Sequence, residues 1–224
     1  MAGEPTTLNT AQTIAQALRE QILSGELAPH TRVTQRDLAA KFGFSPMPAR
    51  DAVKILLAEG LVVQEGSKTI VVAPVNTEDF VEIMDMRTLL EPRALELSIP
   101  NLIDEDLAAA RAALSRSGTT HDPRQVVANH WDFHRALYRR AGRPRLLNLI
   151  EQHHNLLARY LLPAWAQFGV MDEWAPDEVA LMELCEQRRV DEAVEWLRND
   201  LALAKDRVIQ PAQQQIALSV RQPA

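Results

Sequence analysis

The residues with the clearest chemical potential stand at the start of a short predicted helix that follows Gly43. Ser45, Pro46 and Met47 form its first turn, and Arg50 follows one turn later on the side away from the apolar residues. An exposed guanidinium at this place can donate two parallel hydrogen bonds to O6 and N7 of a guanine, which discriminates between bases by roughly 1–3 kcal/mol. These four residues are therefore candidate contacts to base edges.

Three more residues could contact DNA around the same helix. Arg36 lies in the preceding predicted helix and could reach a phosphate or a base from the side. Gly66 and Lys68 lie in a turn between two β-branched runs, where the Gly66 backbone and the Lys68 ammonium could touch the minor groove or its phosphates. The alternative is that Arg36, Arg50 and Lys68 are ordinary solvated charges. Their combined placement favours DNA binding.

Local periodicity predicts the elements that hold these residues. Apolar residues at helical spacing indicate helices over residues 8–24, 35–42 and 45–59, and Gly43 supplies the turn between the last two. Residues 61–63 and 69–72 are β-branched runs around a Gly-bearing turn, which predicts a β-hairpin. A hairpin directly after a helix-turn-helix is a wing.

The rest of the chain follows a helical pattern without a further strand signal. It predicts a helix from Thr77 and others at about 103–116, 123–141, 144–168, 176–188 and 190–209. The fold class expected is mostly α: an N-terminal winged helix-turn-helix plus a C-terminal antiparallel all-helical bundle. The predicted domains are residues 1–75, 76–210 and a flexible Gln- and Pro-rich tail, 211–224.

The overall acidity of the chain does not exclude DNA binding, because it is unevenly distributed. Residues 1–75 hold seven Lys/Arg and seven Asp/Glu, so the net charge of −6 belongs to residues 76–224, with 17 Lys/Arg and 23 Asp/Glu. No apolar run approaches the ~18 residues that span a bilayer, and no secretory signal is evident. The single cysteine, Cys185, is expected to be a small buried residue and fits a reducing cytoplasm.

The N-terminal motifs resemble the GntR family of transcription regulators. The resemblance is carried by residues 22–29 (ILSGELAP), 34–39 (TQRDLA) and 45–53 (SPMPARDAV). Gly60, which follows the last predicted helix of this part, and Gly66 in the turn of the wing also fit. It implies that Arg36, Arg50, the start of the recognition helix and the wing contact an operator half-site, and that a homodimer binds a palindromic site. Two positions depart from the family. His30 stands where Gly is usual, and Pro46 stands where an Arg often sits, which removes one possible base contact.

The C-terminal part resembles the FCD type of effector domain, the helical bundle of FadR-like regulators. Residues 86–91 (MRTLLE), 133–137 (FHRAL) and 141–142 (AG) carry this resemblance. In that family the arginine that matches Arg87 often meets the carboxylate of an organic acid, through two parallel hydrogen bonds. The alternative is a structural ion pair between Arg87 and Glu91, one helical turn on.

The same resemblance implies a divalent metal site at His130, His134, Glu178 and Asp200. His130 replaces an aspartate, and carboxylates replace two later histidines of the family pattern. Because His130 and His134 share one helix face, a mixed site could hold zinc, iron, manganese or nickel. The alternative is a metal-free cavity that grips the ligand by hydrogen bonds. His154, in phase with apolar neighbours, is either a core histidine or a contact to that cavity.

These patterns predict a ligand-responsive transcription regulator, most simply a repressor, with a small organic acid as its effector. Two other functions stay open. One is a metal-dependent enzyme that activates water at His130 and His134. No phosphate loop, His-Glu-x-x-His pair or Ser or Cys nucleophile with an evident base supports it. The other is a bundle that only dimerises and binds no ligand.

Overall fold

The computed structural model describes residues 7–66, 69–168 and 175–220, and side chains within residues 10–66, 69–162 and 178–206. The chain divides into two compact units, Met1–Val75 and Asn76–Ala224. Each unit has its own core.

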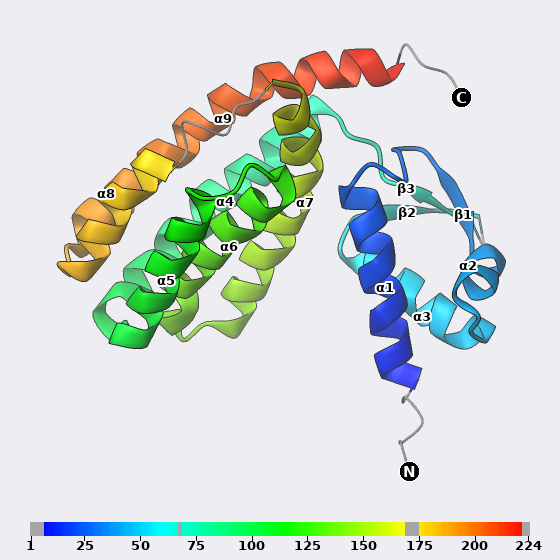
Figure 1. Ribbon diagram of the computed structural model, residues 1–224, viewed down its shortest axis with the longest axis horizontal. Coiled ribbons are helices and arrows are strands. Elements are labelled where there is room, and N and C mark those ends of the chain that lie inside the picture. Colours follow the sequence, from blue (N-terminus) through cyan, green and yellow to red (C-terminus); the bar gives the residue numbers. More distant parts are fainter. Residues whose placement is uncertain (1–6, 67–68, 169–174, 221–224) are drawn as a thin grey trace. The chain divides into compact units, whose positions relative to one another are not determined.

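The first unit is a winged helix-turn-helix (Figure 1). Its elements are α1 (Thr7–Leu23), β1 (Arg32–Thr34), α2 (Gln35–Phe42), α3 (Pro46–Ala58), β2 (Val62–Glu65) and β3 (Thr69–Val72). α1 and α2 both pack against α3, and the core between them includes Ile14, Leu38 and Leu56. The three strands form one antiparallel sheet in the order β1-β3-β2. The predicted helices and hairpin are confirmed.

Local signals position α2 and α3. The Thr34 side chain accepts a hydrogen bond from the Asp37 backbone while the Asp37 carboxylate accepts one from the Thr34 backbone, which is a capping box. Gly43 ends α2 in the left-handed region, with φ of 68°, and its N–H bonds back to carbonyls of α2. Pro46 begins α3, where its missing N–H leaves no helical bond unmade.

The sequence did not predict β1. Arg32 pairs with Val71 and Thr34 with Thr69, so β1 adds an outer strand to the wing hairpin. The sequence predicted no element between the helices over residues 8–24 and 35–42. A three-residue strand is too short to show a periodic pattern in the sequence, so β1 could not be predicted from its own residues.

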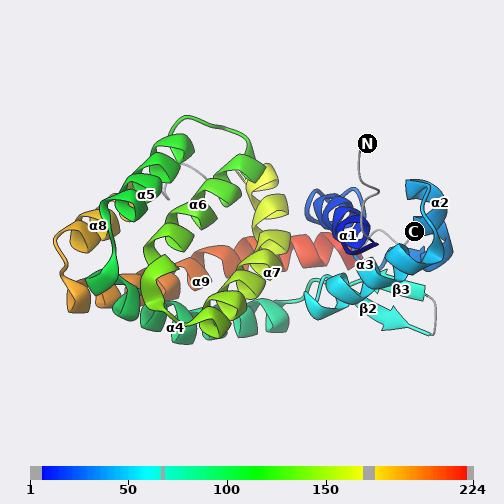
Figure 2. The same ribbon diagram turned by 90° about the horizontal axis from the view of Figure 1, so that it is seen from below.

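The second unit is a helical bundle (Figures 1 and 2). It contains α4 (Thr77–Ser98), η1 (Ile99–Asn101), α5 (Asp104–Ser117), α6 (Pro123–Tyr138), η2 (Arg139–Ala141), α7 (Pro144–Phe168), α8 (Ala175–Glu186) and α9 (Val190–Val220). α4 packs against α6, α7 and α9, and α5 packs against α6 and α8. Cys185 is buried as expected, and burial raises the pKa of its thiol to about 12.

α9 extends beyond the helix predicted over about residues 190–209, and the flexibility of residues 211–224 stays a prediction. The helix continues to Val220, and residues 221–224 lie outside the described part of the chain. Residues 212–218 are Ala, Gln, Ile and Leu, which favour helix once a preceding helix has nucleated it.

Candidate nucleic-acid interface and buried polar cluster

The start of α3 presents its predicted contact residues to the outside of the first unit. Ala49, Ala52 and Leu56 bury the apolar side of the helix. On the other side Ser45, Pro46 and Arg50 are exposed, and the Met47 side chain is 60% exposed. Ser45 occupies the N-cap position, but its side chain makes no capping hydrogen bond. The exposed side of the first turn is therefore available to an external partner.

Arg36 and Arg50 differ from the other arginines of this unit in their pairing. Arg19 forms an ion pair with Glu59, and Arg32 forms one with Glu65. Arg36 on α2 and Arg50 on α3 are exposed, and the side chain of neither forms an ion pair or hydrogen bond with any residue that the structure describes. Two guanidinium groups on the helix-turn-helix are thus left for an outside acceptor.

The wing is a short hairpin whose turn includes Gly66. Gly66 is exposed and has a φ of 79°, in the left-handed region that a residue without Cβ enters most easily. The Gln64 side-chain amide donates to the carbonyl oxygens of Gly66 and Thr69, which braces the turn. Lys68, the other predicted wing contact, lies outside the described residues.

Inside the second unit, three of the four predicted metal-ligating residues meet. His130 and His134 lie one turn apart on α6, Glu178 lies on α8, and all three are buried. Their potential ligand atoms lie within 4.8 Å of one another. His130 Nδ1 contacts Glu178 Oε1, and His134 Nε2 lies 3.9 Å from that same oxygen. α6 and α8 are separate in the sequence, and the packing of the bundle brings their side chains together.

Asp200, the fourth predicted ligand, is not part of this group. It lies on α9 and is partly buried, and its charge acts on Arg87. Among the described His, Cys, Asp and Glu residues, the group that could hold a metal ion consists of His130, His134 and Glu178 alone.

Arg87 pairs with Glu91, as in the second of the two interpretations of this arginine. Arg87 Nε and Nη2 donate to the two carboxylate oxygens of Glu91 over 2.5 and 3.4 Å, and Arg87 Nη1 lies 3.7 Å from the sulfur of Met84. Both members of the pair are buried. A carboxylate ligand would have to share this guanidinium with Glu91.

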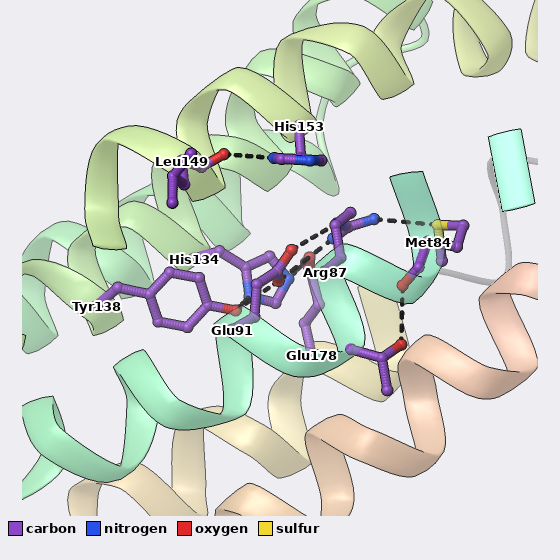
Figure 3. A network of polar contacts seen from close by, with 9 residues as sticks. Met84, Arg87, Glu91, His134, Tyr138, Leu149, His153 and Glu178 are labelled. Carbon is purple, nitrogen blue, oxygen red and sulfur yellow. Dashed lines mark hydrogen bonds and ion pairs between the residues drawn. The ribbon is translucent and has the colours of Figure 1, made fainter. Parts of the chain in front are cut away.

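Tyr138 joins the ion pair to the histidine cluster, and sequence reasoning missed it. Its hydroxyl lies 2.8 Å from Glu91 Oε2 and 3.0 Å from His134 Nδ1 (Figure 3). The available signal was spacing: Tyr138 follows His134 by one helical turn, as Glu91 follows Arg87. The result is a continuous polar chain from Arg87 through Glu91 and Tyr138 to His134.

Burial sets the charge states in this cluster. It holds the pKa of His134 well below the usual value, with help from the charges of His130, Arg87 and His154, so the His134 imidazole is neutral. Burial also opposes the charge of Arg87, but the Glu91 carboxylate outweighs it and raises the Arg87 pKa. Burial and the same carboxylate raise the pKa of Tyr138, which keeps its hydroxyl proton.

His154 lies at the edge of this cluster on α7. Its ring stacks on Trp131 with centroids 4.5 Å apart and lies 6.1 Å from the His130 ring. The residue is 3% exposed, and its Nε2 has no hydrogen-bond partner among the residues whose side chains the structure describes. A buried ring nitrogen without a partner is unusual, because an unmet polar group in a core costs about 1–3 kcal/mol.

A winged helix-turn-helix followed by a helical bundle is an architecture suited to a DNA-binding transcription regulator. The comparisons with known proteins identify the class more closely. Residues 10–72 match the bacterial regulatory proteins of the gntR family, and residues 82–203 match the FCD domain. The chain therefore belongs to the GntR family of regulators and carries an FCD domain.

Known relatives match most of the chain. A crystal structure of a GntR family regulator from Pseudomonas syringae pv. tomato str. DC3000 is 35% identical, with a TM-score of 0.61, over 96% of this chain and 91% of that one. The uncharacterized HTH-type transcriptional regulator YdhC of Bacillus subtilis is 26% identical over 83% of this chain and 80% of its own length. The HTH-type transcriptional repressor GlaR of Escherichia coli is 28% identical over 64% and 68%.

Within the described part of the chain, no helix combines the length and the apolar character needed to cross a membrane.

Proposed function

We propose that the protein is a repressor that binds a palindromic operator as a homodimer and responds to a small organic acid. The observation that carries the DNA-binding half is the pair of exposed arginines, Arg36 and Arg50, that lack an ionic partner among the described residues. Arg50, Ser45, Pro46 and Met47 face base edges in this proposal. Arg36 and the wing, through Gly66 and Lys68, contact phosphates or the groove beside them.

The proposed repressor activity is supported by the name of one relative, the repressor GlaR. Dimeric binding follows from the general geometry of helix-turn-helix regulators, in which two recognition helices read half-sites about one helical turn apart. We expect the protein to act in the cytoplasm, where the DNA is and where its single cysteine stays reduced.

The proposed effector site is the buried cluster of the second unit. Arg87 supplies a positive charge for a carboxylate, and His130, His134 and His154 supply polar nitrogens around it. The His154 Nε2 atom supports this proposal, because the described residues leave it without a hydrogen bond and a ligand could supply one. We assign the cluster to sensing rather than catalysis because the relatives are transcription regulators.

We further propose that a divalent metal binds at His130, His134 and Glu178. Two imidazoles and a carboxylate suit zinc, manganese, iron or nickel, and their ligand atoms are already within 4.8 Å of one another. When bound, the metal would act as a Lewis acid. Three protein ligands leave coordination positions for a carboxylate oxygen of the effector. Asp200 would join only if α9 or its side chain moved toward the group.

The DNA-binding proposal is tested with the duplex that the wild-type protein selects from a random pool. In a gel-shift assay, Arg50→Ala should weaken specific binding about 5- to 150-fold, which corresponds to the roughly 1–3 kcal/mol of a bidentate arginine–guanine contact. Arg93→Ala removes an exposed arginine from the second unit and is the matched control. Unchanged discrimination by Arg50→Ala would remove this residue from the interface. A selected sequence without two-fold symmetry would contradict the dimer.

The metal proposal is tested by elemental analysis of protein purified without chelators or nickel resin. We expect close to one divalent ion per chain in the wild type and little in His134→Asn. Asparagine keeps an N–H near the position of Nδ1 but has no atom at Nε2, so the bond toward Tyr138 can survive. Thermal-shift screening of organic acids then tests the effector. Equal metal content in both proteins would refute this site.

A further inference from the structure

The hydroxyl of Tyr138 lies between two buried polar groups and has only one proton to donate. Glu91 Oε2 is 2.8 Å from the hydroxyl oxygen, and His134 Nδ1 is 3.0 Å from it. Both distances are those of ordinary hydrogen bonds. Figure 3 shows the phenol oxygen of Tyr138 beside the Glu91 carboxylate and the imidazole of His134. The direction of each bond therefore depends on which group supplies its proton.

The neighbours of Glu91 decide the first bond. Glu91 already accepts N–H groups from the Arg87 guanidinium, which holds it as a carboxylate. A carboxylate accepts hydrogen bonds and donates none. The Tyr138 hydroxyl therefore donates its hydrogen bond to Glu91. Toward His134, the Tyr138 oxygen can then only accept a hydrogen bond. It follows that His134 Nδ1 carries a hydrogen.

The other side of the His134 ring agrees with this proton placement. In a neutral imidazole, a hydrogen on Nδ1 leaves Nε2 with a lone pair that bonds to no hydrogen. Nε2 lies 3.9 Å from Glu178 Oε1, which is too long for a hydrogen bond. That oxygen instead contacts His130 Nδ1. No proton is shared between His134 and Glu178.

We propose that Tyr138 is a positioning residue that holds His134 in the Nδ1–H tautomer, so that the Nε2 lone pair is offered to a divalent cation beside His130 and Glu178. The identity of the cation rests on the proposed function, whereas the tautomer does not. Groups that orient a metal-binding histidine through its second nitrogen typically contribute 10- to 100-fold to metal affinity. Through Glu91, the same chain connects His134 to Arg87.

The tautomer is measured in the metal-free, full-length protein labelled with ¹⁵N-histidine. The sequence has six histidines, and His134→Asn assigns the signal of interest. Long-range ¹H–¹⁵N correlation should show a protonated Nδ1 and an unprotonated Nε2 at His134. A wild-type spectrum with the hydrogen on Nε2 overturns the inference without any variant at Tyr138.

Tyr138→Phe tests the role of the hydroxyl, and Tyr160→Phe is the control. Tyr160 is also buried, and its hydroxyl donates to Asp79 at 2.6 Å, within the same unit but away from the cluster. We expect Tyr138→Phe to change the His134 tautomer and to weaken Zn²⁺ binding 10- to 100-fold, and Tyr160→Phe to do neither. An unchanged tautomer in Tyr138→Phe would refute the positioning role. If the tautomer changes but the wild type binds no Zn²⁺, the metal proposal fails and the positioning role stands.

Discussion

Arg87 and Glu91 form an ion pair whose side chains are only 3% and 1% exposed. A buried pair of this kind contributes little net stability, because its desolvation offsets its attraction. Removing one partner is different, since the other charge then remains buried and unpaired. Arg87→Ala alone is therefore a poor test of effector binding, because a loss of affinity would be mixed with a loss of stability.

We predict that Arg87→Met lowers the free energy of unfolding of the second unit by about 3–5 kcal/mol, and that Arg87→Met/Glu91→Gln lowers it by less. The amide of the double variant carries no charge and can still accept from Tyr138. Urea unfolding followed by tryptophan fluorescence reports on this unit alone, because all four tryptophans lie in residues 76–224. Equal losses in the two variants would show that the unpaired charge is not the cause.

The buried His154 predicts a pH dependence of stability. Burial, together with the charges of Arg87 and His130, holds the pKa of His154 well below the usual value. The unfolded chain, with a histidine pKa near 6.5, takes up a proton below that pH and the folded chain does not. The free energy of unfolding therefore falls as the pH falls below about 6.5, by up to ~1.4 kcal/mol per pH unit for this residue.

His154→Phe should flatten this dependence, while the aromatic ring keeps a partner for Trp131. The comparison is urea unfolding of metal-free wild type and variant between pH 7.5 and 5.5. Buried His134 adds a change of the same sign in both proteins, so it cancels in the difference. Parallel curves for the two proteins would contradict the assignment to His154.

At the scale of the elements, the left-handed backbone conformation occurs in the first unit both at glycines and at a residue with a side chain. Gly43, between α2 and α3, has a φ of 68°, and His30, before β1, has a φ of 67°. The first position carries the residue that the conformation favours. The second carries a residue with a Cβ, where the family usually has Gly. The same physical rule therefore predicts opposite effects of substitution at the two positions.

We predict that Gly43→Ala destabilises the first unit by about 1 kcal/mol and that His30→Gly stabilises it by a smaller amount. At Gly43 the cost is backbone strain alone, since a Cβ there would meet no atom within 4 Å. The gain at His30 is reduced by the added freedom of glycine in the unfolded chain. Residues 1–75 contain no Trp or Tyr, so hydrogen exchange of α1 and α3 amides is the measurement. The same sign at both positions would contradict this account.

At the scale of the whole molecule, charge and chemistry are divided between the two units. The acidic excess belongs to residues 76–224, and the two arginines without a described partner belong to the first unit. The buried cluster draws its residues from α4, α6, α7 and α8 of the second unit. The residues of each proposed site therefore belong to one unit, and the two proposed sites should be separable by mutation.

We predict that Arg50→Ala leaves metal content and the urea unfolding of the second unit unchanged, and that His134→Asn leaves base discrimination on the selected operator unchanged. His134→Asn should instead alter how strongly an organic acid changes DNA affinity, because ligand and DNA binding are linked reciprocally. The measurements are elemental analysis and gel shifts with matched and mismatched duplexes. Loss of metal from Arg50→Ala would show that the two sites depend on each other.

The sequence by itself determined the features that depend only on residues close together in the sequence. Helical spacing, the cap at Thr34, the glycine turn at Gly43 and the alternation of the wing are local, so they predicted the helix-turn-helix, the hairpin and the bundle. They also placed Arg50 on the exposed side of its helix and His130 beside His134.

Only the tertiary structure decided which distant residues meet. β1 forms because β3 lies beside it, and Glu178 reaches His130 because α8 packs against α5, which in turn packs against α6. The packing also decided that Arg87 pairs with Glu91, one of its two predicted interpretations, and that Tyr138 on α6 reaches Glu91 on α4. Burial removes water as a partner, so each buried polar group bonds to whatever the packing brings near it, and periodicity along the chain does not specify that choice.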